Sequence, residues 1–477
     1  MTELIDQNLR EYFQPERIQM VFNQYEIAKQ DYFDPSVVKI SMGADGISHK
    51  TFKKELEQRC AFISNRVLNG TYQFYPFREV SIQKPSGGER ILSIATIRDI
   101  LVQKLLYEAL YNEVESKFRA TSQLDRVSCA YRKQKSAPYA ATLIHRYIKQ
   151  GYQFALDADI VKFFERIPHP ELFKLIEDLF GQNTLASKML KRFINAGGTP
   201  SKDVCGKSKK FHHYKPNRQE IRRTEGLPQG GILSGMLANL YLHSFDRWIV
   251  DDLSHRYSLR YVRYADDFIF LLKKQSEIAL VHQDVFQKLQ DLQLELHSLE
   301  SGKTRYVDIY KNGLDFVGFH FSTEHIKVGN RNIQRFKDRI SEKIKKEQNN
   351  KFGLNSRYRL KRFIINVINR KIVGCGEEIC SLCNGVKGEK VRSWIGFFST
   401  ITDVKQLHEL DKWIRVEIGT YFWRRYGISI SRADFRRVGL ASLEQEYYKI
   451  YKRQMCKCAI SSECDRNLTI YSNRSID

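Results

Sequence analysis

The order of hydrophobic and polar residues predicts a chain that mixes helices with strands. Near the N-terminus, Ile18, Val21 and Phe22 recur at helical spacing close to Tyr25 and would form one apolar face. Residues 281–294 show a similar amphipathic pattern. Shorter runs rich in Val, Ile, Phe and Tyr are bounded by turn residues, which is typical of strands. Both kinds of element therefore belong to the fold.

The most informative stretch, residues 260–272, places two apolar, β-prone runs on either side of one acidic step. It predicts a β-hairpin with Asp266 and Asp267 at the turn. Adjacent carboxylates among aromatic residues repel each other and are costly to bury unpaired. A divalent cation removes that cost, and hard oxygen ligands suit Mg²⁺. A solvated Asp-Asp turn is the alternative that this stretch alone leaves open.

A second acidic strand lies upstream, within residues 154–164. It carries Asp157 and Asp159 and is expected to continue through Phe164. Between the two acidic strands, residues 225–234 form a glycine-rich turn that leads into an apolar helix. The order is thus an acidic strand, a glycine-rich loop with its helix, and an acidic hairpin.

A further hairpin is predicted at residues 77–92, where a Ser-Gly-Gly turn separates two strands. Arg78, Lys84 and Arg90 recur in it at intervals of six, and strands folded back on each other would bring such cations toward one phosphate chain. An ordinary solvated β-hairpin is the alternative.

Composition narrows the class of partner. Lys and Arg number 78 against 55 Asp and Glu, a formal charge of +23 in 477 residues. Such a surplus favours a polyanion and phosphate contacts, although an acidic membrane surface would also attract it. No run of about 18 apolar residues is present to span a bilayer, and the first ten residues lack a signal-peptide core. We expect a cytoplasmic protein that does not enter a membrane.

The nine cysteines fit reduced thiols better than a disulfide scaffold in so long a chain. Six of them fall late, and three of these together with one more would supply the four thiolates of a zinc site. Their irregular spacing favours free thiols, and zinc stays open as the alternative. The late cysteines are Cys375, Cys380, Cys383, Cys456, Cys458 and Cys464.

Taken in this order, the acidic strand, the Leu-Pro-Gln-Gly-Gly loop and the Tyr-Ala-Asp-Asp hairpin resemble the palm of reverse transcriptases of the group II intron-like type. The resemblance runs, patchily, from about residue 43 to 427. It implies an α+β right-hand polymerase with fingers, a ferredoxin-like palm with an antiparallel sheet, and a helical thumb. The implied segments are an N-terminal extension (1–42), fingers (43–150), palm (151–325, with a basic insertion at 196–224), thumb and maturase-like region (326–427) and C-terminal extension (428–477).

The resemblance also implies the catalytic centre. Asp159 and Asp266 would hold two Mg²⁺ ions, with Asp267 beside them and Ile160 among the metal-binding positions. One ion lowers the pKa of a primer 3′-hydroxyl, and the other steadies the triphosphate and pyrophosphate. Asp157 has the chemistry of a ligand too, and it shares the strand face of Asp159.

Nucleotide-binding residues follow from the same resemblance. Family alignment selects Asp159 because Phe164 then falls five residues on, where its ring would collide with a ribose 2′-hydroxyl. Gln229 and Gly230 would line the pocket near the templating base. The hairpin cations Arg78, Lys84 and Arg90 would grip the incoming triphosphate. Lys303 is placed to protonate the leaving pyrophosphate, unless it is only a surface lysine.

Two positions depart from the family pattern. Residues 128–132 stand where related enzymes read Tyr-Gly-Phe-Arg, with Ala130 in place of the glycine. The glycine-rich motif continues into Gly235, where intron enzymes commonly carry proline. The departure at Gly235, together with the absence of a readable endonuclease pattern, favours the bacterial defence-associated group over an intron-encoded protein, while Ala130 bears only on the backbone conformation at its own position.

Two segments are strongly basic. In residues 196–224 we interpret the cations as a solvated loop near nucleic acid, with a metal site at Cys205 and the neighbouring His212 and His213 as the weaker alternative. Residues 331–370 hold 13 Lys and Arg against 3 Asp and Glu, with apolar residues at helical spacing. This suits a thumb that holds a duplex by its phosphates, or else a plain solvated face. The candidate RNA-binding residues are Lys345, Lys346, Lys361 and Arg362.

Three functions fit these patterns. The first is an RNA-directed DNA polymerase that uses dNTPs and an RNA template, in antiviral defence with a partner non-coding RNA or in intron mobility. The second is a maturase-like RNA-binding protein, which intact acids disfavour. The third is an RNA-directed RNA polymerase, which Phe164 disfavours. A homo-oligomer remains open.

Overall fold

The computed structural model describes residues 2–31, 34–83, 88–200, 222–347, 360–361, 363–372, 377–379, 386–389 and 394–452. The predictions for Lys84, the segment 201–221, Arg362 and the six late cysteines lie outside these residues, as does the side chain of Lys346. No helix in the described part of the chain is long and apolar enough to cross a membrane.

The chain folds into two compact units. The first comprises Met1–Ser136 and Tyr152–Val307, and the second comprises Ala137–Gly151 and Asp308–Asp477. This grouping differs from the five segments inferred from the sequence, because the N-terminal helices join the first unit and residues 308–325 join the second. The acidic strands, the glycine-rich loop and the basic hairpin all belong to the first unit.

The first unit is built on a four-stranded sheet with the order β7-β8-β5-β9. β7 (Arg260–Tyr264) and β8 (Asp267–Leu272) form the predicted acidic hairpin, and β8 also pairs antiparallel with β5 (Phe154–Asp159). β9 spans Arg305–Asp308. The buried runs on β5 and β8 explain why these residues form central strands.

The expectation that the acidic strand continues through Phe164 is wrong. β5 ends at Asp159, and the chain then turns at Lys162, whose φ of 48° is left-handed. Phe164 lies in the short helix α8 (Phe163–Arg166). The apolar residues after Asp159 therefore continue the core without continuing the strand, a distinction that hydrophobicity alone does not make.

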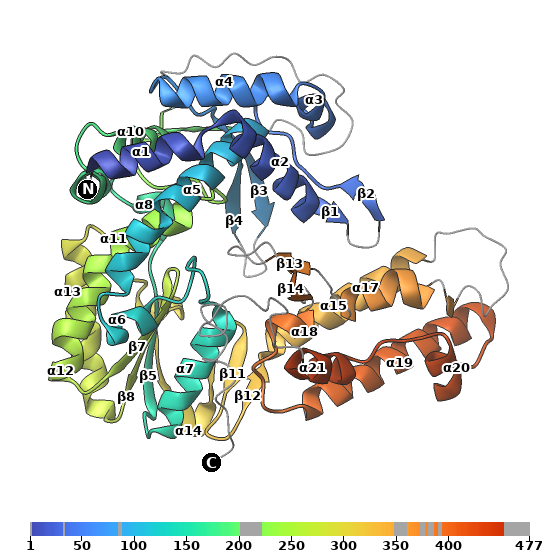
Figure 1. Ribbon diagram of the computed structural model, residues 1–477. Helices are drawn as coiled ribbons and strands as arrows, with labels where there is room; N and C mark the ends of the chain where they lie inside the picture. The colour runs from blue at the N-terminus through green and yellow to red at the C-terminus, as the bar shows by residue number, and fades with distance from the viewer. Residues whose placement is uncertain are drawn as a thin grey trace. The chain divides into compact units, whose positions relative to one another are not determined.

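Helices cover one face of this sheet (Figure 1). α11 (Ser234–Trp248) packs Phe245 against Tyr261 and Phe268 of the hairpin, and α13 (Ile278–Asp291) contacts β5. α11 continues as a π-helix, Ile249–Leu253, into α12 (Ser254–Arg256). The sheet that carries the acids is thus held on one face by packed aromatic rings.

A second sheet in the first unit has the order β4-β3-β6. β3 (Phe77–Gln83) and β4 (Glu89–Ile94) are the predicted basic hairpin, and β6 (Gly198–Pro200) pairs parallel with β3. Helix α5 (Ile97–Phe118) follows directly and is capped by the Thr96 hydroxyl. The remaining elements of this unit are β1 (Gln30–Asp31), β2 (Asp34–Val38), α3 (His49–Lys54), α4 (Leu56–Leu68) and α6 (Ser122–Val127), together with 3₁₀ turns at Gln275–Glu277 and Leu299–Ser301.

The N-terminal helices α1 (Thr2–Tyr12) and α2 (Pro15–Lys29) are part of the core. The predicted apolar face of α2 is confirmed, and Leu9 and Phe13 are also fully buried. The Asp6 carboxylate accepts hydrogen bonds from the backbone N–H groups of Leu185 and Ala186, at the start of α10 (Leu185–Ile194). The N-terminal segment is therefore tied to residues nearly 180 positions later.

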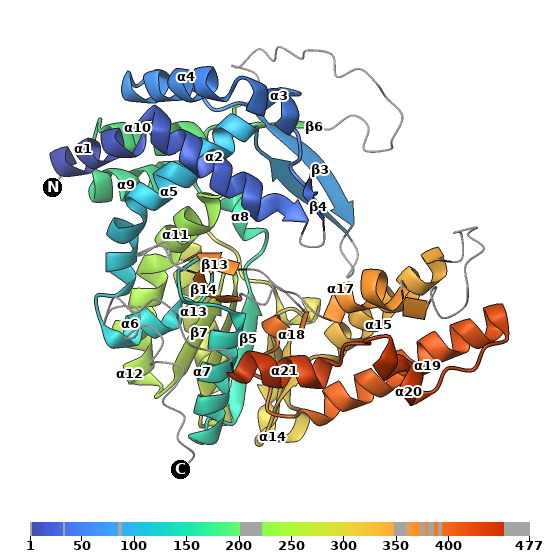
Figure 2. The ribbon, with the colours of Figure 1, turned by 45° about the vertical axis from the view of Figure 1, so that its right-hand side comes forward.

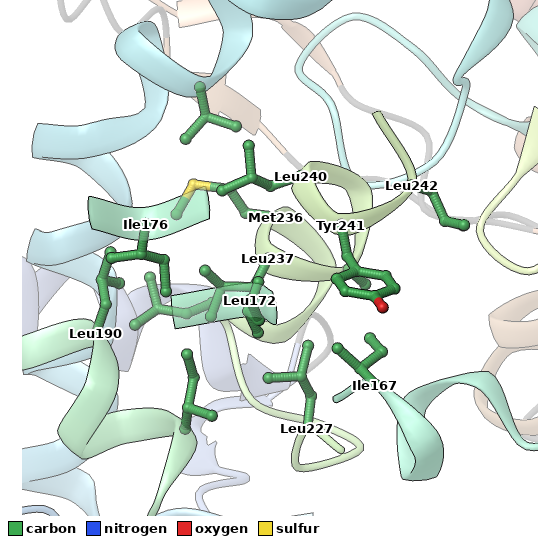
Figure 3. Close-up of a cluster of buried hydrophobic side chains, with 14 of the residues drawn as sticks. Ile167, Leu172, Ile176, Leu190, Leu227, Met236, Leu237, Leu240, Tyr241 and Leu242 are labelled. Carbon is green, nitrogen blue, oxygen red and sulfur yellow. The ribbon is translucent and has the colours of Figure 1, made fainter. Parts of the chain in front are cut away.

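A buried cluster anchors the glycine-rich loop (Figure 3). Leu227 of that loop lies beside Ile167 and near side chains of α11, α10 and α9 (His169–Phe180). Leu227, Ile167, Leu172 and Leu190 are each 1% exposed or less. The loop is therefore fixed at its beginning, while the residues after it open α11.

The second unit contains a three-stranded sheet and a set of helices (Figure 2). Its main helices are α7 (Ala137–Lys149), α15 (Asn330–Glu347) and α19 (Lys405–Tyr426), and the Ser341 hydroxyl of α15 bonds Glu417 of α19 at 2.9 Å. Its other described elements are β10 (Leu314–Phe316), β11 (Phe319–Phe321), β12 (Ile326–Val328), β13 (Glu377–Ile379), β14 (Val386–Glu389), α14 (Ile309–Asn312), a π-helix at Ile364–Ile368, α17 (Asn369–Ile372), α18 (Trp394–Phe397), α20 (Arg432–Arg437) and α21 (Leu443–Lys452).

Candidate active site

Three predicted carboxylates meet at one end of the first unit's sheet. Asp159 is the last residue of β5 and stands directly opposite Asp267, the first residue of β8. Asp266 precedes it in the hairpin turn, next to Ala265, whose φ of 62° is left-handed. The sheet register brings together acids that are 108 residues apart in the sequence.

A buried ion pair holds that turn. The Arg263 side chain is fully buried, and its Nε donates to Asp246 Oδ1 of α11 at 2.9 Å. Its Nη1 donates to Asn239 Oδ1 at 2.8 Å and to the carbonyl oxygen of Ala265 at 3.0 Å. One guanidinium thus joins the helix beneath the sheet to the turn that carries Asp266. Sequence patterns do not reveal this network, since its members are distant and look ordinary.

The acids carry an excess of negative charge. Asp267 is exposed at the start of β8. Partial desolvation and, after it, the negative charges of Asp266, Asp159 and Asp157 nevertheless raise its pKa to about 7, while the positive charge of Lys303 opposes this change. Burial, and then Asp159, raise the pKa of Asp266, while Arg90 and Lys303 oppose the change. The nearby cations therefore do not compensate the carboxylates fully.

Three basic residues lie beside the carboxylates of β5. Lys303 Nζ is 3.5 Å from Asp159 Oδ2 and 2.9 Å from His297 Nε2, and that imidazole nitrogen is 3.7 Å from Asp159 Oδ2. Arg305 Nε donates to Asp157 Oδ2 at 2.8 Å. Lys303 therefore lies at the acids, as its predicted role requires. Sequence reasoning missed His297 and Arg305, which only the β5–β9 neighbourhood identifies.

The acids fit Mg²⁺ by donor type and by charge. Their oxygens are the hard ligands that Mg²⁺ prefers. Burial and then mutual repulsion raise the pKa values of Asp266 and Asp267, and a bound cation would offset both effects. Among the described residues, no three Asp, Glu, His or Cys side chains are gathered into a complete ligand set. Ile160, the other predicted position, has a buried side chain and forms a bridge with Leu296.

The glycine-rich loop is held from three sides. The Gln229 carbonyl accepts from Ser93 N of β4 at 2.7 Å, and Gln103 Oε1 of α5 accepts from Ile232 N at 2.8 Å. Gly230 has a φ of 112°, and a Cβ there would lie 2.9 Å from the Ser93 carbonyl oxygen. The Gln229 side chain donates to Glu165 Oε1 at 3.2 Å. Both predicted pocket residues thus lie between the basic hairpin and α8.

Phe164 lies partly exposed beside this loop, while its neighbour Phe163 is buried in the core. Leu227 N donates to the Phe164 carbonyl at 2.6 Å, which ties α8 to the loop. The Phe164 ring packs edge-on against Phe163 and also against Tyr131. Tyr131 is a further aromatic residue at the site that the sequence alone did not indicate.

The basic hairpin places its two described cations differently. Arg78 is half-buried and donates from Nε to the Met42 carbonyl at 2.9 Å, and burial lowers its pKa. Arg90 is exposed, and its positive charge acts to lower the pKa of Asp266. Arg90 is paired with Ile82, so it shares a hairpin face with Arg78 but stands four ladder positions away, roughly 13 Å along the strands. Arg90 is the more accessible of the two.

In the second unit, Lys345 and Lys361 are exposed to solvent. Cys60 and Cys129, the two described cysteines, are buried and outside any disulfide, in line with the reduced thiols expected for the chain. The alternative of a zinc site at the late cysteines stays a prediction, because those cysteines lie outside the described residues.

The paired acids, the glycine-rich loop with its helix and most of the basic hairpin fall within one segment that a family model matches. The model of the family "Reverse transcriptase (RNA-dependent DNA polymerase)" matches residues 82–321, just over half of the chain. The chain belongs to this family, and the predicted α+β fold of right-hand polymerases is confirmed.

Its similar proteins include intron-encoded ones. The group II intron-encoded protein LtrA of Lactococcus lactis is 30% identical over 211 residues, which cover 43% of this chain and 29% of that protein. Protein YkfC of Escherichia coli is 22% identical over 321 residues, 60% of this chain and 77% of the relative. Among solved structures, apo telomerase from Candida tropicalis has a TM-score of 0.41 at 12% identity and covers 82% of this chain and 75% of its own. The predicted resemblance to group II intron-like proteins is thus confirmed, while the chain spans less than a third of the Lactococcus protein.

Proposed function

We propose that the protein is an RNA-directed DNA polymerase that makes DNA from dNTPs on an RNA template. The observation that carries this proposal is the register of β5 and β8, which sets Asp159 opposite Asp267 with Asp266 in the adjoining turn. The formal charge of +23 supports a polyanionic partner. Family membership supports the choice of reaction.

Asp159 and Asp266 would hold two Mg²⁺ ions, with Asp267 beside them. When bound, the ions supply the charge that acidifies a primer 3′-hydroxyl and stabilises the triphosphate. Arg90 and Arg78, with Lys84, bind the triphosphate, and Gln229 and Gly230 line the pocket at the templating base. Phe164 excludes a 2′-hydroxyl. Lys303 Nζ, 3.5 Å from Asp159, donates a proton to the leaving pyrophosphate.

The test is the paired variant Asp266→Asn with Asp267→Asn. We expect it to abolish Mg²⁺-dependent dNTP incorporation while RNA binding stays nearly unchanged, because the acids serve chemistry and the cations elsewhere supply affinity. Single-nucleotide extension of a primer on RNA measures the first, and a filter-binding titration the second. Continued polymerisation by the folded double variant would contradict the assignment, and parallel loss of both properties would point to misfolding.

For the biological role, we propose that the enzyme copies a partner RNA in the cytoplasm. Relatives named as intron-encoded proteins favour group II intron RNA as that partner, whereas Gly235, where intron enzymes commonly carry proline, favours a non-coding RNA in antiviral defence. Sequencing the RNA and DNA that co-purify with the protein separates the two. A maturase-like protein without synthesis would yield RNA alone, and an RNA polymerase would yield complementary RNA.

A further inference from the structure

Tyr131 occupies a strained position between two firmly held neighbours. Its φ of 57° is left-handed, a conformation that bulky residues rarely adopt. The Ala130 carbonyl accepts from Asn239 Nδ2 at 2.7 Å, and the buried Arg132 guanidinium donates to both carboxylate oxygens of Glu115, at 2.8 and 3.0 Å. The surrounding structure thus fixes the backbone so that the Tyr131 ring stands away from the core, 49% exposed.

The ring lies directly on Gly235. A Cβ added to Gly235 would come within 2.3 Å of Tyr131 Cγ and 2.5 Å of Cδ1. Gly235 is helical, near the start of α11, and it needs no positive φ. Since alanine is ordinarily favoured over glycine inside a helix, the reason for glycine here is the ring above it. Tyr131 and Gly235, 104 residues apart, are therefore one packing unit.

The ring also lies close to Phe164 of the proposed nucleotide site. Its centroid is 6.0 Å from that of Phe164, with the planes at 80°, a favourable edge-to-face arrangement. Burial and, after it, the charge of Asp266 raise the pKa of the Tyr131 hydroxyl to about 12, while Arg90 opposes the change, so both charges lie within electrostatic reach. Tyr131 thus lies among Phe164, the acids and the basic hairpin.

We propose that Tyr131 is a positioning residue for sugar selection, whose ring holds Phe164 in one orientation against the 2′ position of the incoming nucleotide. Gly235 is part of the same device because it leaves the space that the ring fills. Without the Tyr131 ring, Phe163 is the one aromatic neighbour that Phe164 keeps within the described part of the chain, and Phe164 gains room to rotate. This inference rests on the proposed function, since it requires Phe164 to meet the sugar of a bound dNTP.

The main test compares sugar choice in Tyr131→Ala, Tyr131→Phe, Phe164→Ala and the Tyr131→Ala/Phe164→Ala pair. The measurement is kcat/KM for one dNTP and the matching rNTP on an RNA template with a primer. We expect Tyr131→Ala to reduce the dNTP preference roughly two- to tenfold, mainly through a lower KM for the rNTP. Tyr131→Phe should keep the preference because it keeps the ring. The pair should show no more loss than Phe164→Ala alone, because Tyr131 acts through Phe164.

The outcomes separate the two proposals. A preference unchanged by Tyr131→Ala but reduced by Phe164→Ala overturns the role of Tyr131 alone. Losses that multiply in the pair, or a Tyr131→Phe variant as permissive as alanine, overturn it as well. A wild-type protein without dNTP incorporation overturns the proposed function and this inference together. A Phe164→Ala variant with wild-type sugar choice overturns the role of Phe164 in sugar selection, and this inference with it, but leaves the proposed polymerase activity standing.

Gly235→Ala provides an independent test of the packing. We expect this variant to have a lower Tm than wild type and a reduced dNTP preference, because the methyl group displaces the ring. Combined with Tyr131→Gly, which removes the ring and also the Cβ that would lie 2.9 Å from the new methyl group, the clash is gone and helix propensity favours the alanine, so the double variant should melt no lower than Tyr131→Gly. A Gly235→Ala protein with wild-type Tm and sugar choice would contradict the proposal.

Discussion

At the scale of single residues, the charges of the acids are the reason for proposing a cation at the sheet end. Asp267 has a pKa of about 7 because desolvation and three neighbouring carboxylates oppose its ionisation. This is well above the value of about 3.9 expected for an unfolded chain. A raised folded pKa means that the stabilised form is the protonated one. The contribution of Asp267 to the stability of the cation-free protein is therefore present below about pH 4 and is lost as the pH rises through about 7.

We expect Mg²⁺ to raise the Tm more at pH 8 than at pH 6, because the cation binds the ionised carboxylates and protons compete with it below pH 7. Asp267→Asn should remove most of this pH dependence. The measurement is thermal unfolding with and without Mg²⁺ at both pH values. Asp178→Asn, an exposed acid on α9, is the matched control. An equal shift at both pH values would show that Asp267 does not titrate against the cation.

At the scale of elements, the hairpin turn depends on α11, a helix that is not adjacent to it in the sequence. The Arg263 guanidinium joins Asp246 and Asn239 of α11 to the Ala265 carbonyl, so the turn moves with α11. The same helix begins with the glycine-rich motif. One element consequently positions both the acids and the proposed nucleotide pocket.

We predict that Asp246→Asn lowers the free energy of unfolding by about 3–5 kcal/mol, because it leaves a buried guanidinium without its counter-charge. Arg263→Met with Asp246→Leu should recover much of that stability but not the rate of incorporation, since the Ala265 carbonyl still lacks its donor. Denaturation curves and kcat measure the two effects. Arg256→Met, which breaks two exposed ion pairs on α12, should change stability by about 0–1 kcal/mol. Recovery of kcat in the double variant would show that the turn holds itself.

The sequence was informative where one element contains its own signal. Both hairpins formed as alternation and turn residues predicted, and Ser234 onward is helical as expected. The end of β5 was missed because apolar residues continue past Asp159 in either conformation. Arg305, His297 and Tyr131 were missed because their roles come from partners brought near by the sheet or by α11. Local periodicity contains no information about partners that are distant in the sequence.

At the scale of the whole molecule, excess positive charge should govern RNA affinity. Replacing Lys345, Lys346, Lys361 and Arg362 by Gln should weaken RNA binding and reduce the slope of log K against log salt, by up to about 0.7–0.9 for each phosphate that the variant no longer neutralises. The measurement is a binding titration at several salt concentrations.

A matched set of cations that already pair with carboxylates serves as the control for this prediction. Neutralising its members to Gln should leave the salt slope nearly unchanged, since these charges are already compensated within the protein. An unchanged slope in the first set would show that its basic face is only solvated. The control residues are Lys53, Arg59, Lys174 and Arg256.

The tie between Asp6 and the start of α10 has a consequence for synthesis on the ribosome. Asp6 and Leu185 are separated by 179 positions, so at 5–20 residues per second the partner of the first helix appears roughly 10 to 35 s later. During that interval Leu9 and Phe13, fully buried in the finished protein, have no α10 to pack against. The nascent chain therefore presents the apolar face of this amphipathic helix to solvent, where chaperones that bind such faces have access to it until α10 appears.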